Sequence, residues 1–164
     1  MLISARNSIN LILICCLLFI GCQETKEEEP QKMRIPQMKP QNWSLWRVTD
    51  QNPLPDEMED GFLEIGRSPE MSFGVLMVNE RVSARSHKQH DMLVYVHKGS
   101  AWFYMNEERA FVSTGHTMYV PRGTIYSANR YGDLPLHFFL VYTPVFDGSD
   151  LHYHERAEME RSTQ

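Results

Sequence analysis

Cysteine is scarce in this chain and is absent after residue 22. All three cysteines, Cys15, Cys16 and Cys22, lie within the first 22 of the 164 residues. No disulfide can therefore form beyond Cys22, so the rest of the chain must be stabilised by its own apolar core. The same scarcity excludes a cysteine nucleophile and a thiolate-bound zinc ion from the folded part.

Excess positive charge and long apolar runs are also missing. The formal net charge is −5, and an acidic chain is a poor match for a phosphate backbone, so we expect no nucleic-acid partner. The one apolar run, "INLILICCLLFIGC" at 9–22, is shorter than the about 20 apolar residues that cross a bilayer as a helix. Its length and position are typical of the apolar region of a secretory signal.

The end of that run, "FIGC", resembles the bacterial lipobox, in which a small residue precedes a lipidated cysteine. The resemblance implies that residues 1–21 are a lipoprotein signal peptide and that Cys22 carries the lipid. We therefore expect export and anchoring in the bacterial cell envelope. Because Gln23 is not aspartate, the enteric sorting pattern favours the outer membrane, with the periplasmic face as the alternative. A plain secretory signal and an uncleaved anchor are the alternatives.

The remainder of the chain divides by composition. Residues 22–42 are polar and proline-containing, which predicts a solvated, disordered tether. From Trp43 onward, short apolar runs are separated by glycine, proline, asparagine and aspartate, a pattern typical of strands and turns. The expected strands are 44–49, 62–66, 72–79, 92–98, 101–106, 110–114, 117–121 and 136–143.

So many short strands predict an all-β sandwich or barrel over residues 43–146. We expect residues 147–164 to form a C-terminal tail or a short helix.

Two motifs place the strands in a family. The stretch "GHTMYVPRGTIYSAN" sets Gly115, Pro121 and Gly123 at the spacing Gly, five residues, Pro-x-Gly, and "MLVYVHKG" ends a strand at Gly99. In this order the chain resembles the small single-domain cupins. The resemblance implies an antiparallel double-stranded β-helix, the cupin or jelly-roll barrel, and is compatible with a homodimer.

The family's metal ligands are mostly replaced. In cupins, two histidines and a glutamate of the first motif and a histidine of the second hold a metal inside the barrel. Aligned on the glycine and proline markers, these positions fall on Arg85, His87, Met92 and Tyr126, so the resemblance implies a degenerate metal site. Strand alternation directs Met92 inward, and it predicts that His97 is a surface histidine.

The substitutions lead to our first hypothesis, a binding module. An inward Arg85 offers a planar fork for a carboxylate or phosphate, and Tyr126 offers a hydroxyl. Without an external anion, Arg85 would need an internal acid such as Asp91 or Glu80, or access to solvent at the barrel mouth. We therefore expect Arg85, His87, Met92 and Tyr126 to line a pocket for a small anionic or sugar-like ligand.

Two further functions stay open. His87 and His90 could share one divalent ion, with Asp91 or Tyr126 adding an oxygen, and such ligands suit Zn, Fe, Mn or Ni. That arrangement would make the protein a metal-dependent enzyme of the dioxygenase or isomerase type. If His87, His90 and a third donor meet at one point, metal chemistry is favoured over ligand capture. The remaining alternative is a structural or interaction role at the cell envelope.

Overall fold

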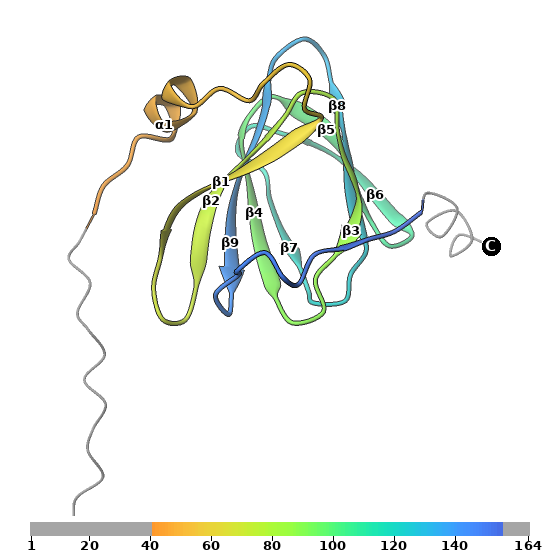
Figure 1. The fold of residues 1–164 in the computed structure, drawn as a ribbon. Helices are drawn as coiled ribbons and strands as arrows, with labels where there is room; N and C mark the ends of the chain where they lie inside the picture. The colour runs from red at the N-terminus through yellow and green to blue at the C-terminus, as the bar shows by residue number, and fades with distance from the viewer. Residues whose placement is uncertain (1–40, 156–164) are drawn as a thin grey trace, which may run out of the picture. The chain divides into compact units, whose positions relative to one another are not determined.

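A computed structural model describes residues 41–155 of the chain. The predicted signal peptide, Cys22, almost all of the predicted tether and residues 156–164 lie outside this range. Within the described part, no helix is long and apolar enough to cross a membrane. The elements, shown in Figure 1, are α1 (Leu45–Gln51), β1 (Asp60–Arg67), β2 (Ser72–Val78), β3 (Arg81–Ser86), β4 (Asp91–Lys98), β5 (Ser100–Met105), β6 (Glu108–Ser113), β7 (Thr117–Val120), β8 (Tyr126–Tyr131), β9 (Leu136–Thr143) and β10 (His152–Tyr153).

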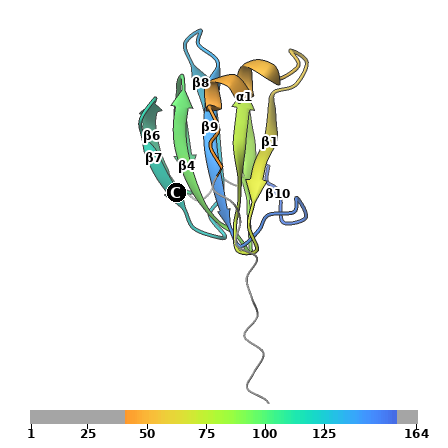
Figure 2. The ribbon, with the colours of Figure 1, turned by 90° about the vertical axis from the view of Figure 1, so that its left-hand side faces the viewer.

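The strands form two five-stranded sheets. The first has the order β1-β2-β9-β4-β7 and the second the order β10-β3-β8-β5-β6, and neighbouring strands are antiparallel. Strands distant in sequence, such as β2 and β9, therefore lie side by side, as Figure 2 shows. This arrangement is the predicted antiparallel double-stranded β-helix.

Alternation along β4 shows how the sequence builds the barrel interior. Met92, Val94 and Val96 are almost fully buried, whereas Leu93 and Tyr95 on the opposite face are 45% and 36% exposed. The inward residues join side chains from both sheets, including Phe103 of β5 and Phe138 of β9, in one core. The predicted register of Met92 is therefore confirmed.

The prediction for His97 is wrong. The side chain does lie on the outer side of the core, next to a register shift between Val96 and Lys98. It is nevertheless only 7% exposed, because the indole of Trp46 covers it with a ring-centroid distance of 4.5 Å. A helix docked on the sheet exterior buries the histidine that strand alternation alone assigned to solvent.

That helix is α1, formed by residues expected to be a strand. Ser44 caps it by accepting a hydrogen bond from the Arg47 amide at 3.4 Å. Trp46 and Thr49, three residues apart, share a helix face, and Thr49 is buried. A run this short fits both a two-residue and a 3.6-residue period, so the pattern could not distinguish strand from helix.

Two polar strands and one short strand were not predicted. β3 and β8 contain too many polar residues to stand out, yet they pair with each other in the second sheet. The region expected to be a tail or short helix contains β10, in which His152 and Tyr153 pair with Ser86 and Arg85. Residues that follow β9 thus return to the barrel and complete a sheet.

The register of β4 gives a direct test of the fold. Met92→Ala should lower the free energy of unfolding by about 2–5 kcal/mol, because it removes buried atoms and leaves a cavity. The adjacent control, Leu93→Ala, should change it by no more than about 0.5 kcal/mol, since its side chain is largely exposed. Urea denaturation measures both values. Losses of equal size would contradict the alternation.

Candidate metal and ligand site

The structure brings the four predicted site residues into the barrel. Arg85, His87, Met92 and Tyr126 are 6%, 3%, 1% and 3% exposed. Arg85 of β3 and Tyr126 of β8 are cross-strand partners, and His87 immediately follows β3. The alignment to the cupin motifs therefore located buried positions correctly, while their part in binding a ligand is a separate question.

Arg85 already has a carboxylate partner. Its guanidinium forms an ion pair with Asp60 of β1, in which both side chains are largely buried, and its Nε donates to the Ser83 carbonyl at 3.0 Å. The internal acid is thus Asp60, and neither of the two acids considered from the sequence. Because the buried charge is compensated inside the protein, Arg85 does not require an external anion.

Asp91, one of those two acids, is committed elsewhere. It forms an ion pair with Arg122 at 2.6 Å and accepts a hydrogen bond from the Arg122 amide. The Arg122 guanidinium and amide lower the pKa of Asp91 to about 2. Asp91 therefore stabilises the turn between β7 and β8 through Arg122. It is not the oxygen ligand proposed to accompany His87 and His90.

The hydrogen bonds of His87 fix its tautomer. Its Nδ1 lies 2.7 Å from the Asp150 carbonyl oxygen, which can only accept, so Nδ1 carries the proton. Nε2 then accepts from the Tyr126 hydroxyl at 2.9 Å. Tyr126 is in turn hydrogen bonded to Tyr142, and this assignment leaves Tyr142 as the donor.

Burial keeps this chain of groups neutral. It lowers the pKa of His87 below its ordinary value, and it raises the pKa values of Tyr126 and Tyr142 well above theirs. At neutral pH the barrel interior therefore holds a neutral imidazole and two phenols beside the Arg85–Asp60 ion pair.

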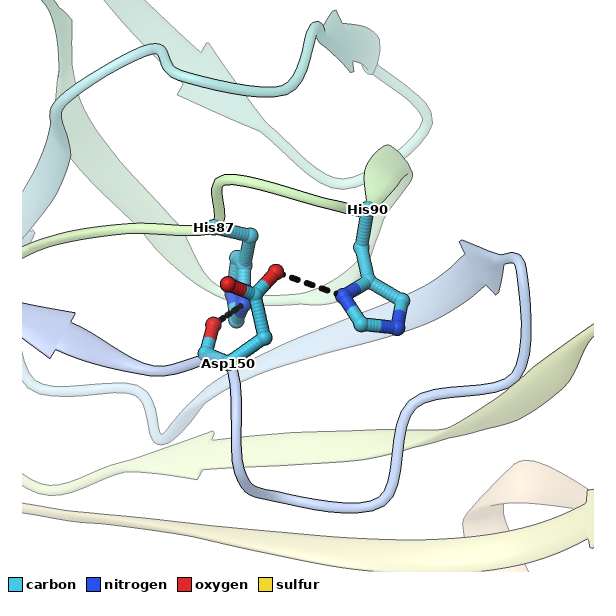
Figure 3. A group of neighbouring side chains, drawn as sticks. All are labelled: His87, His90 and Asp150. Carbon is cyan, nitrogen blue, oxygen red and sulfur yellow. Dashed lines mark hydrogen bonds and ion pairs between the residues drawn. The ribbon is translucent and has the colours of Figure 1, made fainter.

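Asp150 is a further residue of the site, and it was not predicted from the sequence. Its carboxylate accepts hydrogen bonds from the amides of Lys88 and Gln89 at 3.0 and 2.7 Å and from Nδ1 of His90 at 2.7 Å. Burial alone would raise its pKa, but hydrogen bonds from His90, Gln89 and Lys88 hold that pKa well below its ordinary value. Figure 3 shows the carboxylate beside both imidazoles.

His90 lies between two acceptors. Its Nδ1 faces Asp150, and its Nε2 lies 3.1 Å from the Val145 carbonyl. These two contacts fix the orientation of the His90 ring. Phe146 covers this end of the barrel, with its ring stacked on Tyr142 at 4.6 Å and 5.3 Å from that of His90.

The three residues also meet the requirements of a metal site. One ligand atom from each of His87, His90 and Asp150 can be chosen so that all lie within 4.8 Å of one another. Both imidazoles turn Nδ1 toward Asp150, while their Nε2 atoms have outer partners in Tyr126 and Val145. Such outer partners are what metal-bound histidines usually have. This group could bind a metal ion, so the metal alternative gains a third donor, Asp150, that was not predicted from the sequence.

Comparison with known proteins identifies the fold. No known family profile matches the sequence, and no curated protein matches it. A Klebsiella pneumoniae protein with a double-stranded β-helix domain superposes with a TM-score of 0.60, at 16% identity over 72% of this chain and 100% of that chain. TT1209 from Thermus thermophilus gives 0.56, at 18% identity over 64% and 98%.

The cupin domain of Cnp3 from Schizosaccharomyces pombe gives a TM-score of 0.50, at 16% identity over 54% of this chain and 66% of that chain. Pac13 from Streptomyces, solved with uridine, gives 0.52, at 17% identity over 59% and 79%. The chain therefore has the cupin fold, as its motifs predict. At these identities the likeness extends to the fold alone.

The Asp150 carboxylate should make stability fall in acid. Its pKa is lowered on folding, so its contribution is complete above the ordinary value of about 4 and is lost as the pH falls below it. Asp150→Asn should cost about 1–3 kcal/mol at pH 7, because it removes a buried acceptor shared by the Lys88 and Gln89 amides and the His90 ring, and should flatten the acid limb. Urea denaturation between pH 3 and 7 measures both effects. An acid limb as steep as that of the exposed control Asp133→Asn would contradict the assignment.

Proposed function

We propose that this cupin-fold protein binds one divalent transition-metal ion through His87, His90 and Asp150. The observation that carries the proposal is the convergence of two Nδ1 atoms on one buried residue, Asp150. The His87 Nδ1 faces its main-chain carbonyl and the His90 Nδ1 faces its carboxylate, while each outer nitrogen has a separate partner. Two imidazoles and a carboxylate suit Zn, Fe, Mn or Ni. When bound, the ion would supply a Lewis acid at the covered end of the barrel.

The protons in the free site predict how binding depends on pH. His90 would bind through Nδ1 and donate Nε2–H to the Val145 carbonyl. His87 would move its proton from Nδ1 to Nε2, where it faces the Tyr126 oxygen. Because an ion needs ring nitrogens that carry no proton, protons compete with it, so affinity should fall as the pH is lowered.

The same residues explain why the ion would lie away from the family's usual centre. Arg85 and Met92 occupy two of the positions that cupins use for ligands, and a guanidinium repels a cation. The proposed donors instead come from the turn after β3 and from the segment that follows β9. The site is thus displaced toward the end of the barrel that Phe146 covers.

A second candidate function is capture of a small polar molecule, anionic or sugar-like, in the barrel. It is favoured by the paired hydroxyls of Tyr126 and Tyr142 beside Arg85, which are polar groups that an apolar core does not need. The Streptomyces protein with uridine has the same fold and a polar ligand. Arg85→Lys should weaken such a ligand in calorimetry, and unchanged affinity would remove Arg85 from the site.

The donor set is also that of non-heme iron oxygenases, which favours the dioxygenase alternative over an isomerase. Oxygen consumption by the Fe(II)-loaded protein, compared with the Zn(II)-loaded protein, tests this alternative.

Metal analysis tests the main proposal. Tag-free protein supplemented with Zn, Mn, Ni or Fe(II) should hold one ion per chain, and His90→Ala and Asp150→Ala should lose it. His116→Ala is the matched control, since His116 is an exposed histidine of the same domain, and it should bind normally. Calorimetry should show weaker binding at pH 6 than at pH 8. Less than about 0.1 ion per chain after supplementation would contradict the proposal.

The location of the protein is a separate proposal. We propose that it is exported and held in the cell envelope by a lipid on Cys22, because "FIGC" resembles a lipobox. Cys22→Ser should move the protein out of the membrane fraction, whereas Cys16→Ser should not. Identical fractionation of the two variants would contradict lipidation at Cys22.

A further inference from the structure

A cavity lies outside the barrel. It is enclosed by α1, by the loop that follows α1 and by the outer face of the first sheet. Its volume is about 250 Å³. The residues that matter for its chemistry are Trp46, Leu54, Met77, Lys98, Pro135 and His137. None of them belongs to the His87–His90–Asp150 group, so the cavity is independent of the proposed metal site.

The sheet supplies the floor of this cavity and the loop its rim. His137 of β9 pairs with Met77 of β2 and with Lys98 of β4, so three neighbouring strands contribute side by side. The Asn79 side-chain amide donates to the carbonyls of Pro55 and Met58, both at 2.9 Å, and holds the loop in place.

Two further contacts close the walls. Gly61 leaves room for Leu54, since a Cβ at this glycine would lie 2.6 Å from the Leu54 Cδ1 atom. Trp46 covers the other side, with the Lys98 ammonium 5.5 Å from its ring centroid. The cavity is thus a built feature of the docked helix and loop.

One residue of the cavity floor, His137, has a buried polar atom without a partner. Among the described side chains, Nδ1 of His137 and Nε2 of His97 are buried without a hydrogen-bond partner, and only His137 lines the cavity. Native proteins contain few such atoms. Burial has the largest effect on the pKa of His137, and together with Lys98 and His97 it lowers that pKa to about 4. The imidazole of His137 is therefore neutral at pH 7.

We propose that this cavity binds a small organic carboxylate with an apolar body. The Lys98 ammonium supplies the counter-charge, and the neutral imidazole of His137 supplies a hydrogen-bond donor beside it. Trp46, Leu54, Met77 and Pro135 enclose the apolar part. Because the volume is below the roughly 300–1,000 Å³ of pockets for drug-sized ligands, the ligand must be small.

The charges in the cavity favour an anion over a cation. The titratable groups that face His137 are Lys98 and His97 from β4, and Asp50 lies across the cavity on α1. A ligand cation would meet Lys98, and Asp50 is the one carboxylate among the lining residues; it is exposed, so its charge is screened by water. An anion gains the Lys98 ammonium and a hydrogen bond from the His137 imidazole.

Phenylacetate is a suitable probe because it combines one carboxylate with a compact ring. Calorimetry on the full chain should show one saturable site for phenylacetate. Benzyl alcohol and phenethylamine, which have neutral and cationic groups on the same ring, should bind at least about tenfold more weakly. Long-range ¹H–¹⁵N spectra should show that the ring nitrogen signals of His137 move during the titration.

Variants separate this cavity from other sites. Lys98→Gln and His137→Phe should each weaken phenylacetate by about tenfold or more, and Asp50→Asn should leave binding unchanged or improve it. Lys98→Gln keeps the test decisive if His137→Phe does not fold. His90→Ala should leave phenylacetate binding unchanged, whatever it does to metal binding. The proposal is overturned if phenylacetate shows no saturable binding up to about 10 mM, or if Lys98→Gln or the change of ligand charge has no effect.

Discussion

The buried carboxylate of Asp150 is the constraint on which the site depends. It is 3% exposed, and a charge removed from water in this way is tolerated only when it is compensated and hydrogen bonded. Its hydrogen bonds come from the turn at 88–90, about sixty residues earlier in the chain, and from Nε2 of His152 at 3.2 Å. One residue therefore fastens the segment that follows β9 across the end of the barrel and holds His87 and His90 in position.

The backbone of Asp150 has a second effect, on protons. Its carbonyl can only accept, so it determines which nitrogen of His87 is protonated, and the hydroxyls of Tyr126 and Tyr142 follow from that choice. The side chain and the main chain of the same residue thus face both Nδ1 atoms. A cation that replaced these two protons would find three donors already gathered, which is why a fold with most of its usual ligands substituted can still suit a metal.

Local patterns predicted the barrel well. Gly99 and Gly123 have φ values of +81°, a region that side chains disfavour, so the spacing of such turn residues carries real information about chain reversals. The alternation along β4 likewise indicated which side chains enter the core. The pattern was weaker at 44–49, where a short apolar run fits helix or strand, and at β3 and β8, whose polar residues conceal their pairing.

The partners of the site could not be predicted in the same way. Asp60 and Asp150 reach Arg85 and His90 from 25 and 60 residues away, and no spacing rule connects acids to bases over such separations. His97 was misassigned for a related reason, since Trp46 covers it from an element that the sequence did not reveal as a helix. Which distant polar residues pair depends on the order of the strands in the sheets. Such pairs can be predicted only after that order is known.

The tautomer of His87 tests the account most directly. Long-range ¹H–¹⁵N spectra at pH 7 should show His87 protonated at Nδ1 in the free protein and at Nε2 after one equivalent of Zn²⁺ is added. A His87 proton on Nε2 from the start, or a tautomer that Zn²⁺ leaves unchanged, would contradict the claim that Asp150 prepares the two imidazoles for an ion.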